Sequence, residues 1–180
     1  MHVLVTRRLT LRQPTALDAE DIALGLSSWN VARMLGPVPF PYRPEDGEHW
    51  VAGLAQKPEG LVYTIHRERL IGVVSIEGGG PEPRLGYWLG ERWHGQGFMT
   101  EAANALLAYG FAMHGWKSVQ SSAFVDNPAS LRVQEKLGFT VTGTGETWSR
   151  PRAARVETWT TRLTAEAFGE FSLPLRKSAA

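Results

Sequence analysis

One segment carries most of the information about the fold, and it reads Leu85-Gly-Tyr-Trp-Leu-Gly-Glu-Arg-Trp-His-Gly-Gln-Gly-Phe-Met-Thr-Glu-Ala102. The aromatic and aliphatic residues over 85–89 predict a buried strand. Gly95 and Gly97 predict a turn in which the backbone can approach a ligand closely. Residues 98–114 are rich in helix formers and contain no proline, so they predict a helix that begins directly after the turn.

The turn before this helix is predicted to bind a phosphate group. The first N–H groups of a helix have no helical partner, and the positive end of the helix dipole adds to their attraction for an anion. A dinucleotide site fits poorly, because Thr100 stands where a third glycine or alanine is needed and Lys117 and Gln120 occupy the region of the acidic ribose contact. A Walker loop does not fit either, because no Gly-Lys-Ser/Thr follows the turn.

Two motifs resemble those of the GNAT N-acetyltransferase superfamily. The segment Arg92-Trp-His-Gly-Gln-Gly97 is similar to the R/Q-x-x-G-x-G/A turn that holds the pyrophosphate of acetyl-CoA. Downstream, Asp126-Asn-Pro-Ala-Ser130 and Glu135-Lys-Leu-Gly-Phe139 resemble the second signature of the superfamily. Because the two motifs occur in the expected order, they are more specific together than either is alone. The resemblance covers roughly residues 7–165, and it points to the RimJ/RimL-like branch.

Patterns along the whole chain predict an α/β domain with the element order β-α-α-β-β-β-α-β-α-β-β. The sheet is expected to be mixed, mostly antiparallel and flanked by helices, in one domain over 1–180 with its core at about 7–165 and a C-terminal tail at 166–180. The predicted strands are 8–12, 61–66, 70–77, 85–89, 116–125, 140–147 and 155–163. The predicted helices are 15–27, 45–57, 98–114 and a fourth that opens at Asn127-Pro128 and ends at Gly138. Four prolines predict that the segment 29–44 is an extended loop.

Composition limits the classes of partner and compartment. The net charge of +1 does not call for nucleic acid, and the absence of cysteine excludes disulfides and thiolate metal sites. The apolar run at the start is shorter than a signal peptide needs, and none reaches the length of a membrane span. We therefore expect a cytoplasmic protein with no metal and with no nucleic acid or membrane partner.

The resemblance implies that acetyl-CoA is the cosubstrate and that it lies along the central strand and the glycine turn. A backbone N–H near Trp88 or Leu89 would polarise the thioester carbonyl. The full set of implied cofactor contacts is Trp88, Leu89, Gly90, Arg92, Trp93, His94, Gly95, Gln96, Gly97, Phe98, Met99, Asn127 and Ser130.

Three residues are the candidates for catalysis. The resemblance implies that Ser130 protonates the departing thiolate, although a serine there could also bond only to the backbone of its helix. It implies that Asn127 binds the pantetheine arm or a water. Branch members often carry glutamate where this chain has Arg84, so the base is left open between Glu77, a histidine (His49 or His66) and ordered water.

The acceptor is predicted to be a primary amine, either a protein N-terminal α-amine or a small-molecule amine such as an antibiotic or polyamine. Trp29, Phe40 and Tyr42 lie in the proline-rich segment and are predicted to wall the acceptor site, unless that segment only packs on the core. The alternative function, from a different class, is a non-catalytic module that binds acyl-CoA. A homodimer is compatible with the resemblance, but composition does not indicate one.

Overall fold

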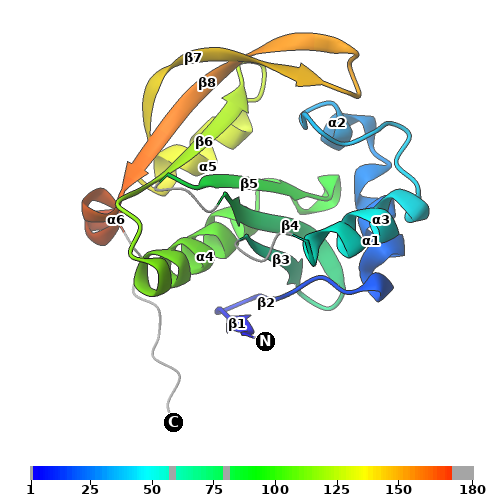
Figure 1. Ribbon diagram of the computed structural model, residues 1–180, viewed down its shortest axis with the longest axis horizontal. Helices are drawn as coiled ribbons and strands as arrows, with labels where there is room; N and C mark the ends of the chain where they lie inside the picture. Colours follow the sequence, from blue (N-terminus) through cyan, green and yellow to red (C-terminus); the bar gives the residue numbers. More distant parts are fainter. Residues whose placement is uncertain (1, 57–59, 79–81, 172–180) are drawn as a thin grey trace.

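The computed structural model describes residues 2–56, 60–78 and 82–171, and in them one sheet runs through the whole molecule (Figure 1). The sheet has eight strands in the order β1-β2-β3-β4-β5-β6-β8-β7. The strands are β1 (Leu4–Val5), β2 (Thr10–Arg12), β3 (Leu61–His66), β4 (Leu70–Glu77), β5 (Arg84–Leu89), β6 (Ser118–Phe124), β7 (Thr140–Ser149) and β8 (Ala154–Thr164). Neighbouring strands are antiparallel except β5 and β6, which are parallel. The mixed, mostly antiparallel sheet predicted from the sequence is therefore confirmed.

Helices cover both faces of the central strands. The helical segments are η1 (Ala16–Asp18), α1 (Ala19–Leu26), α2 (Trp29–Ala32), α3 (Pro44–Leu54), η2 (Glu91–Trp93), α4 (Phe98–His114), α5 (Pro128–Lys136) and α6 (Ala165–Phe171). One core cluster joins α4 to one face of the sheet, and it contains Val74, Leu85 and Leu106. A second cluster joins α1 to the opposite face through Ile22, Leu70 and the partly buried Trp88. The strand β5 therefore lies between two apolar layers, which hold it in place.

Most predicted elements occur where the sequence pattern placed them. The strands β3 and β4 and the helix α4 have the predicted bounds. The alternation at the start is confirmed as well, since Leu9 and Leu11 are buried. The predicted helix 45–57 corresponds to α3, and its predicted end at Lys57 lies outside the described residues.

Three local features differ from the sequence prediction. The segment 29–44 is not loop throughout, because Trp29–Ala32 forms one helical turn and the first proline comes only at Pro37. Leu4–Val5 adds a strand of two residues, which is too short to show a periodic pattern. The predicted element order ends on a strand, whereas a final helix, Ala165–Phe171, forms where the sequence from Thr164 permits a short one. The Ala167 N–H in its first turn donates to Thr164 Oγ1.

Candidate active site

A gap between the two parallel strands lies at the centre of the molecule. β5 and β6 share one register pair, Arg84 with Gln120, at the start of β5. Beyond it a cavity of about 760 Å³ reaches between the strands and is lined by β5, β6 and the first turns of α4 and α5. Parallel strands are normally paired along their length, so the separation leaves backbone groups of β5 free to meet a ligand.

The backbone of β5 directs alternate residues into this gap. The Ser121 hydroxyl donates to the Leu85 carbonyl at 3.0 Å, and His94 Nε2 donates to the Leu89 carbonyl at 2.9 Å. The Gly90 N–H, by contrast, donates to Ile71 of β4. Because backbone direction alternates along a strand, the N–H groups of Tyr87 and Leu89 also face the gap, whereas those of Trp88 and Gly90 face β4. Of the two predicted carbonyl-polarising positions, geometry favours Leu89.

The glycine turn closes one end of the cavity. Gly95 and Gly97 have φ values of +74° and +76°, which a residue with a Cβ adopts only at a cost in energy. The first backbone bond of α4 runs from the Glu101 N–H to the Gly97 carbonyl, so the three N–H groups of residues 98–100 lie ahead of it. The turn therefore presents unbonded donors at a helix N-terminus, as anion binding requires.

The predicted cofactor residues of the turn fall into two groups. Those that line the cavity are Trp88, Leu89, Trp93, His94, Gly95, Gly97, Phe98 and Met99. Gly90, Arg92 and Gln96 lie outside the lining. Gln96 instead stabilises the turn, because its side-chain amide donates to the Arg92 carbonyl at 3.0 Å.

Arg8 in the N-terminal segment holds the glycine turn in place through hydrogen bonds. Arg8 donates from Nη1 to the Gln96 carbonyl at 3.0 Å and from Nε to Glu101 Oε2 at 2.6 Å. Its guanidinium also lies 4.4 Å from the centre of the Phe98 ring. Burial alone would raise the pKa of Glu101, but hydrogen bonds from Thr6 and Arg8 outweigh it and hold that pKa below its ordinary value. Glu101 is therefore an ionised anchor for the turn.

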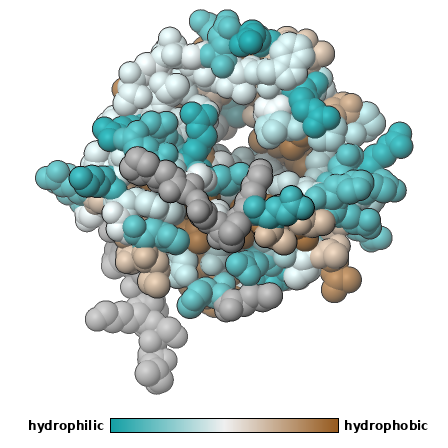
Figure 2. Space-filling model, viewed as in Figure 1, coloured by the Kyte–Doolittle hydropathy of each residue, from teal (hydrophilic) through white to brown (hydrophobic). Residues whose placement is uncertain are grey.

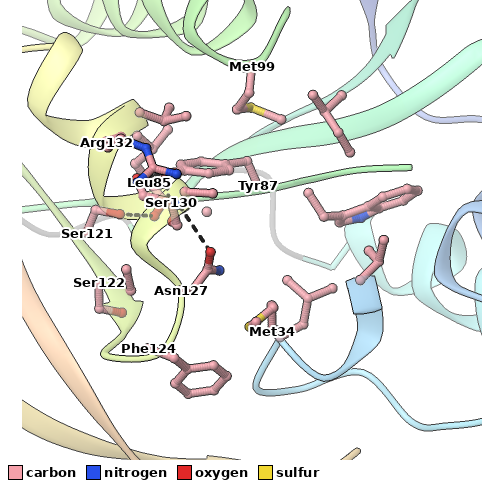
Figure 3. Close-up of a pocket in the computed structure, with 18 of the residues that line it drawn as sticks. Met34, Leu85, Tyr87, Met99, Ser121, Ser122, Phe124, Asn127, Ser130 and Arg132 are labelled. Carbon is pink, nitrogen blue, oxygen red and sulfur yellow. Dashed lines mark hydrogen bonds between the residues drawn. The ribbon is translucent and has the colours of Figure 1, made fainter. Parts of the chain in front are cut away.

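Asn127 and Ser130 come together at the start of α5. Asn127 is the N-cap of this helix, and its Oδ1 accepts from the Ser130 N–H at 3.1 Å. Both residues line the cavity. The Ser130 hydroxyl is not confined to its own helix, because it lies 2.9 Å from the Tyr87 hydroxyl on β5. Figure 3 shows Tyr87 and Ser130 on the same wall, between Met99 and the pair Met34 and Phe124.

Tyr87 and Gln134 are site residues that the sequence analysis missed. Gln134 is fully buried and donates from Nε2 to the Ser122 carbonyl at 3.2 Å, and its Nε2 lies 3.4 Å from both the Tyr87 hydroxyl and Ser130 Oγ. Its Oε1 accepts from Thr161 at 2.7 Å. A signal existed for Tyr87, because it alternates with Leu85 and Leu89 along the strand and so faces the same side.

The base candidates lie at different distances from the gap. Glu77 lines the cavity, stands opposite Arg84 in the β4–β5 register and accepts from the Ser75 hydroxyl at 2.9 Å. His49 and His66 lie outside the cavity lining. The ring of His66 is hydrogen-bonded to Thr64, and burial, helped by the charge of Arg12, lowers its pKa.

The predicted acceptor aromatics do not line the cavity. Tyr42 is buried in the second core cluster, and burial raises its pKa to about 12. Trp29 and Phe40 contact each other edge to face at the surface, with 5.0 Å between ring centres. The same segment nevertheless borders the cavity through residues that the prediction did not choose, which are Asn30, Val31, Arg33, Met34, Leu35, Gly36 and Pro37. For Trp29 the helical turn α2 explains the difference, because it sends neighbouring side chains in different directions.

The turn between β7 and β8 lies over the end of the cavity that residues 30–37 border. We call residues 149–152 with their contacts the arginine bridge. Arg152 donates to both oxygens of Asp126, at 2.9 and 3.1 Å, and from Nε to the Arg33 carbonyl at 2.6 Å. Arg150 donates through its N–H to the Gly36 carbonyl at 2.9 Å and through Nη1 to the Pro37 carbonyl. Figure 2, in the same view as Figure 1, shows an opening between the β7–β8 hairpin and the body of the molecule.

Comparison with solved structures shows which fold this is. A ribosomal-protein-S5-alanine acetyltransferase from Vibrio fischeri superposes with a TM-score of 0.80 at 18% identity, covering 91% of this chain and 97% of that one. RimL, a ribosomal L7/L12 α-N-protein acetyltransferase solved in complex with coenzyme A, gives 0.79 at 22% identity, covering 92% and 99%. The chain therefore has the acetyltransferase fold.

Sequence comparison identifies the family. A model of the acetyltransferase (GNAT) domain matches residues 8–140, and the chain belongs to the GNAT acetyltransferase family. The N-acetyltransferase YoaA of Bacillus subtilis, whose name calls it uncharacterized, is 32% identical over 150 residues, which are 76% of this chain and 82% of YoaA. The ribosomal-protein-serine acetyltransferase of Escherichia coli is 34% identical over 112 residues, 58% of this chain and 62% of that protein. These relatives support the RimJ/RimL-like branch, and the chain is an enzyme of the N-acetyltransferase class.

The part of the chain that the structure describes contains neither a membrane-spanning helix nor a metal-binding cluster. None of its helices combines the length and the apolar character needed to cross a bilayer. Its histidine, aspartate and glutamate side chains do not gather in threes as a metal site would require.

Proposed function

We propose that the protein transfers the acetyl group of acetyl-CoA to a primary amine by direct attack within a ternary complex. The observation that carries this proposal is the gap between β5 and β6, where the N–H groups of Tyr87 and Leu89 face a cavity that extends from the glycine turn to the arginine bridge. In such a passage acetyl-CoA and the amine can enter from opposite ends, and the thioester can lie where they meet. Two proteins of similar fold give indirect support: RimL was solved with coenzyme A, and the microcin C7 self-immunity acetyltransferase MccE (TM-score 0.76, 21% identity) was solved with acetyl-CoA and AMP.

The residues at the turn fit the anionic part of acetyl-CoA. A Cβ built at Gly95 would meet nothing within 4 Å, so a phosphate can approach this backbone closely. Arg132 and Lys136 of α5 also line the cavity, and their charges would favour the phosphates of the nucleotide. When bound, acetyl-CoA would supply the activated acetyl group as a thioester.

Three groups of this chain would act on the thioester. The Leu89 N–H would donate to the oxygen of the carbonyl as negative charge develops on it. The Ser130 hydroxyl would protonate the sulfur as the thiolate leaves. Asn127 would hold Ser130 in place, because it caps the N–H of that residue.

Glu77 is the proposed acceptor of the amine proton, directly or through water. Two carboxylates line the cavity, Glu77 and Asp126. Asp126 is paired with Arg152, whose hydrogen bonds hold the pKa of that carboxyl below its ordinary value. Glu77 lies at the end of β4, the strand paired with β5, and accepts a hydrogen bond from the neutral Ser75 hydroxyl, so we assign the role to Glu77.

The geometry of the arginine bridge favours a slender acceptor. It joins the hairpin turn to residues 33–37 and to Asp126, so the acceptor end of the cavity is framed on all these sides. The terminus of an extended peptide or a small amine can enter such an opening more easily than a lysine on a folded surface. An α-amine, with a pKa of about 7.7–8.0, also loses its proton more readily at neutral pH than a lysine at about 10.4.

The test is thiol release from acetyl-CoA with three kinds of acceptor: peptides with free N-termini, the same peptides N-blocked but with an internal lysine, and small amines. We expect turnover with free N-termini or small amines, with the product identified by its mass. Glu77→Gln should lower kcat about ten-fold or more, whereas the control Glu135→Gln, on the exposed side of α5, should not. Tight coenzyme A binding without thiol release would favour the binding-module alternative, and no binding would refute the turn assignment.

A further inference from the structure

The Ser130 hydroxyl has a phenol as its neighbour. The Tyr87 hydroxyl lies 2.9 Å from Ser130 Oγ and 3.0 Å from the Ser130 carbonyl oxygen. Among the described residues, Tyr87 is the titratable group within hydrogen-bond distance of that hydroxyl. The two residues come from different elements, β5 and α5, and both line the cavity.

A fixed amide orients the hydrogens of this pair. Gln134 Nε2 must donate to the Ser122 carbonyl, because a carbonyl only accepts, and Thr161 donates to Gln134 Oε1. The second hydrogen of Nε2 therefore points to the oxygens of Tyr87 and Ser130. Since Gln134 donates to the pair, the Tyr87 proton is directed to Ser130, where it has two acceptors in reach: the hydroxyl and the carbonyl.

We propose that Tyr87 is a positioning residue that returns a proton to Ser130 as Ser130 protonates the leaving thiolate. This inference rests on the proposed function. A rotation of the Tyr87 hydroxyl from the Ser130 carbonyl to Ser130 Oγ would make the relay continuous, and the Ser130 proton would then point into the cavity. The ring of Tyr87 packs against the main core cluster, so its hydroxyl is held at a fixed place.

The protons and bonds balance in this scheme. The amine nitrogen bonds to the carbonyl carbon, the C–S bond breaks, and its electron pair stays on sulfur. The Ser130 proton passes to sulfur while the Tyr87 proton passes to Ser130 Oγ. The proton lost by nitrogen passes to Glu77 and from there to solvent, and solvent returns one proton to Tyr87, so the net change is one proton moved from the amine to the thiol.

The relay addresses a chemical weakness of serine. An isolated alcohol is a much weaker acid than a thiol of pKa about 8.5, whereas a phenol of pKa about 10 is within two pKa units of it. Burial raises the pKa of Tyr87, although its hydrogen bonds to Ser130 and Gln134 oppose this, so the phenol keeps its proton at neutral pH. A coupled phenol therefore lets Ser130 give up a proton without becoming an alkoxide.

The test is a double-mutant cycle on Tyr87→Phe and Ser130→Ala, with thiol release from acetyl-CoA as the readout. Tyr63→Phe is the matched control, because Tyr63 is a buried tyrosine on β3 that stands beside Val74, as Tyr87 does, but lies outside the cavity lining. We expect Tyr87→Phe to lower kcat about ten-fold or more, with the KM for acetyl-CoA within two-fold. It should also reduce the solvent deuterium isotope effect on kcat, and in the Ser130→Ala protein it should have no further effect. Tyr63→Phe should leave kcat within two-fold.

Two results would overturn the relay while leaving the proposed function intact. One is a wild-type kcat in Tyr87→Phe. The other is an equal loss from Tyr87→Phe in the presence and absence of the Ser130 hydroxyl, because that pattern indicates a packing role that does not act through Ser130. A wild-type protein that binds acetyl-CoA but releases no thiol with any acceptor would overturn the proposed function, and the relay with it.

Discussion

Replacing Arg152 with alanine should loosen the acceptor end of the cavity without altering the cofactor end. The side chain is 17% exposed and makes three contacts with two segments of the chain. At the end of β6 it contacts Asp126 and the Phe124 ring, whose centre is 4.9 Å from its guanidinium carbon, and after α2 it donates to the Arg33 carbonyl. These contacts hold the β7–β8 turn across the opening. Their loss should therefore destabilise the fold and widen the acceptor site together.

The size of the effect follows from the three contacts. The ion pair with Asp126, whose side chain is 48% exposed, is worth about 1 kcal/mol after screening by solvent. The hydrogen bond to the Arg33 carbonyl adds about 1.5 kcal/mol, because its donor is charged. The contact with Phe124 adds about 0.5 kcal/mol. Arg152→Ala should therefore lower the free energy of unfolding by about 3 kcal/mol.

Urea unfolding and steady-state kinetics test this reasoning together. We expect Arg152→Ala to raise the acceptor KM about ten-fold, equivalent to about 1.4 kcal/mol, while the KM for acetyl-CoA stays within two-fold. Arg155→Ala, at an exposed position of the same hairpin, is the control and should change neither quantity. If Arg152→Ala unfolds at the same urea concentration as Arg155→Ala and keeps the wild-type acceptor KM, the bridge does not close the cavity.

Two other predictions concern the turn and the first helix. Gly97→Ala places a Cβ at a φ of +76° and costs about 1–2 kcal/mol, so calorimetry should show coenzyme A binding weakened about ten-fold, whereas Gly53→Ala, with nothing within 4 Å of its added Cβ, should bind normally. Unchanged binding by Gly97→Ala would contradict the turn assignment. Asp18→Asn should lower the free energy of unfolding at pH 7 by about 1.5–3 kcal/mol, because Arg12 donates twice to this carboxylate. Burial would raise the pKa of Asp18, but the bonds from Arg12 and Thr15 outweigh it and lower that pKa, so this stability is present above about pH 3.9 and is lost as pH falls through the folded value. The difference in urea midpoint between the wild type and Asp18→Asn should therefore be smaller at pH 3 than at pH 7, and an equal difference at both pH values would assign the effect to packing.

The sequence alone determined the elements whose cause is local. The helix α4 was predicted with its observed bounds from its run of helix formers after the glycine turn, and the structure shows glycines with a positive φ at both ends, Gly97 and Gly115. The strands β3 and β4 were predicted with their bounds because a run of apolar residues is interrupted by a short charged turn. The glycine turn itself was found in the same way, since its residues are neighbours in the chain.

Tertiary structure decided which side chains meet in the cavity. Tyr87 reaches Ser130 across 43 positions of sequence, and Arg152 reaches the Arg33 carbonyl across 119. Such pairs leave no periodic pattern, because they depend on the sheet order that puts β5 beside β6 and on the hairpin that β8 carries toward α2. Local patterns therefore predicted where a phosphate would bind, while the neighbours of the proposed acid and the frame of the acceptor site emerged only when distant strands were packed together.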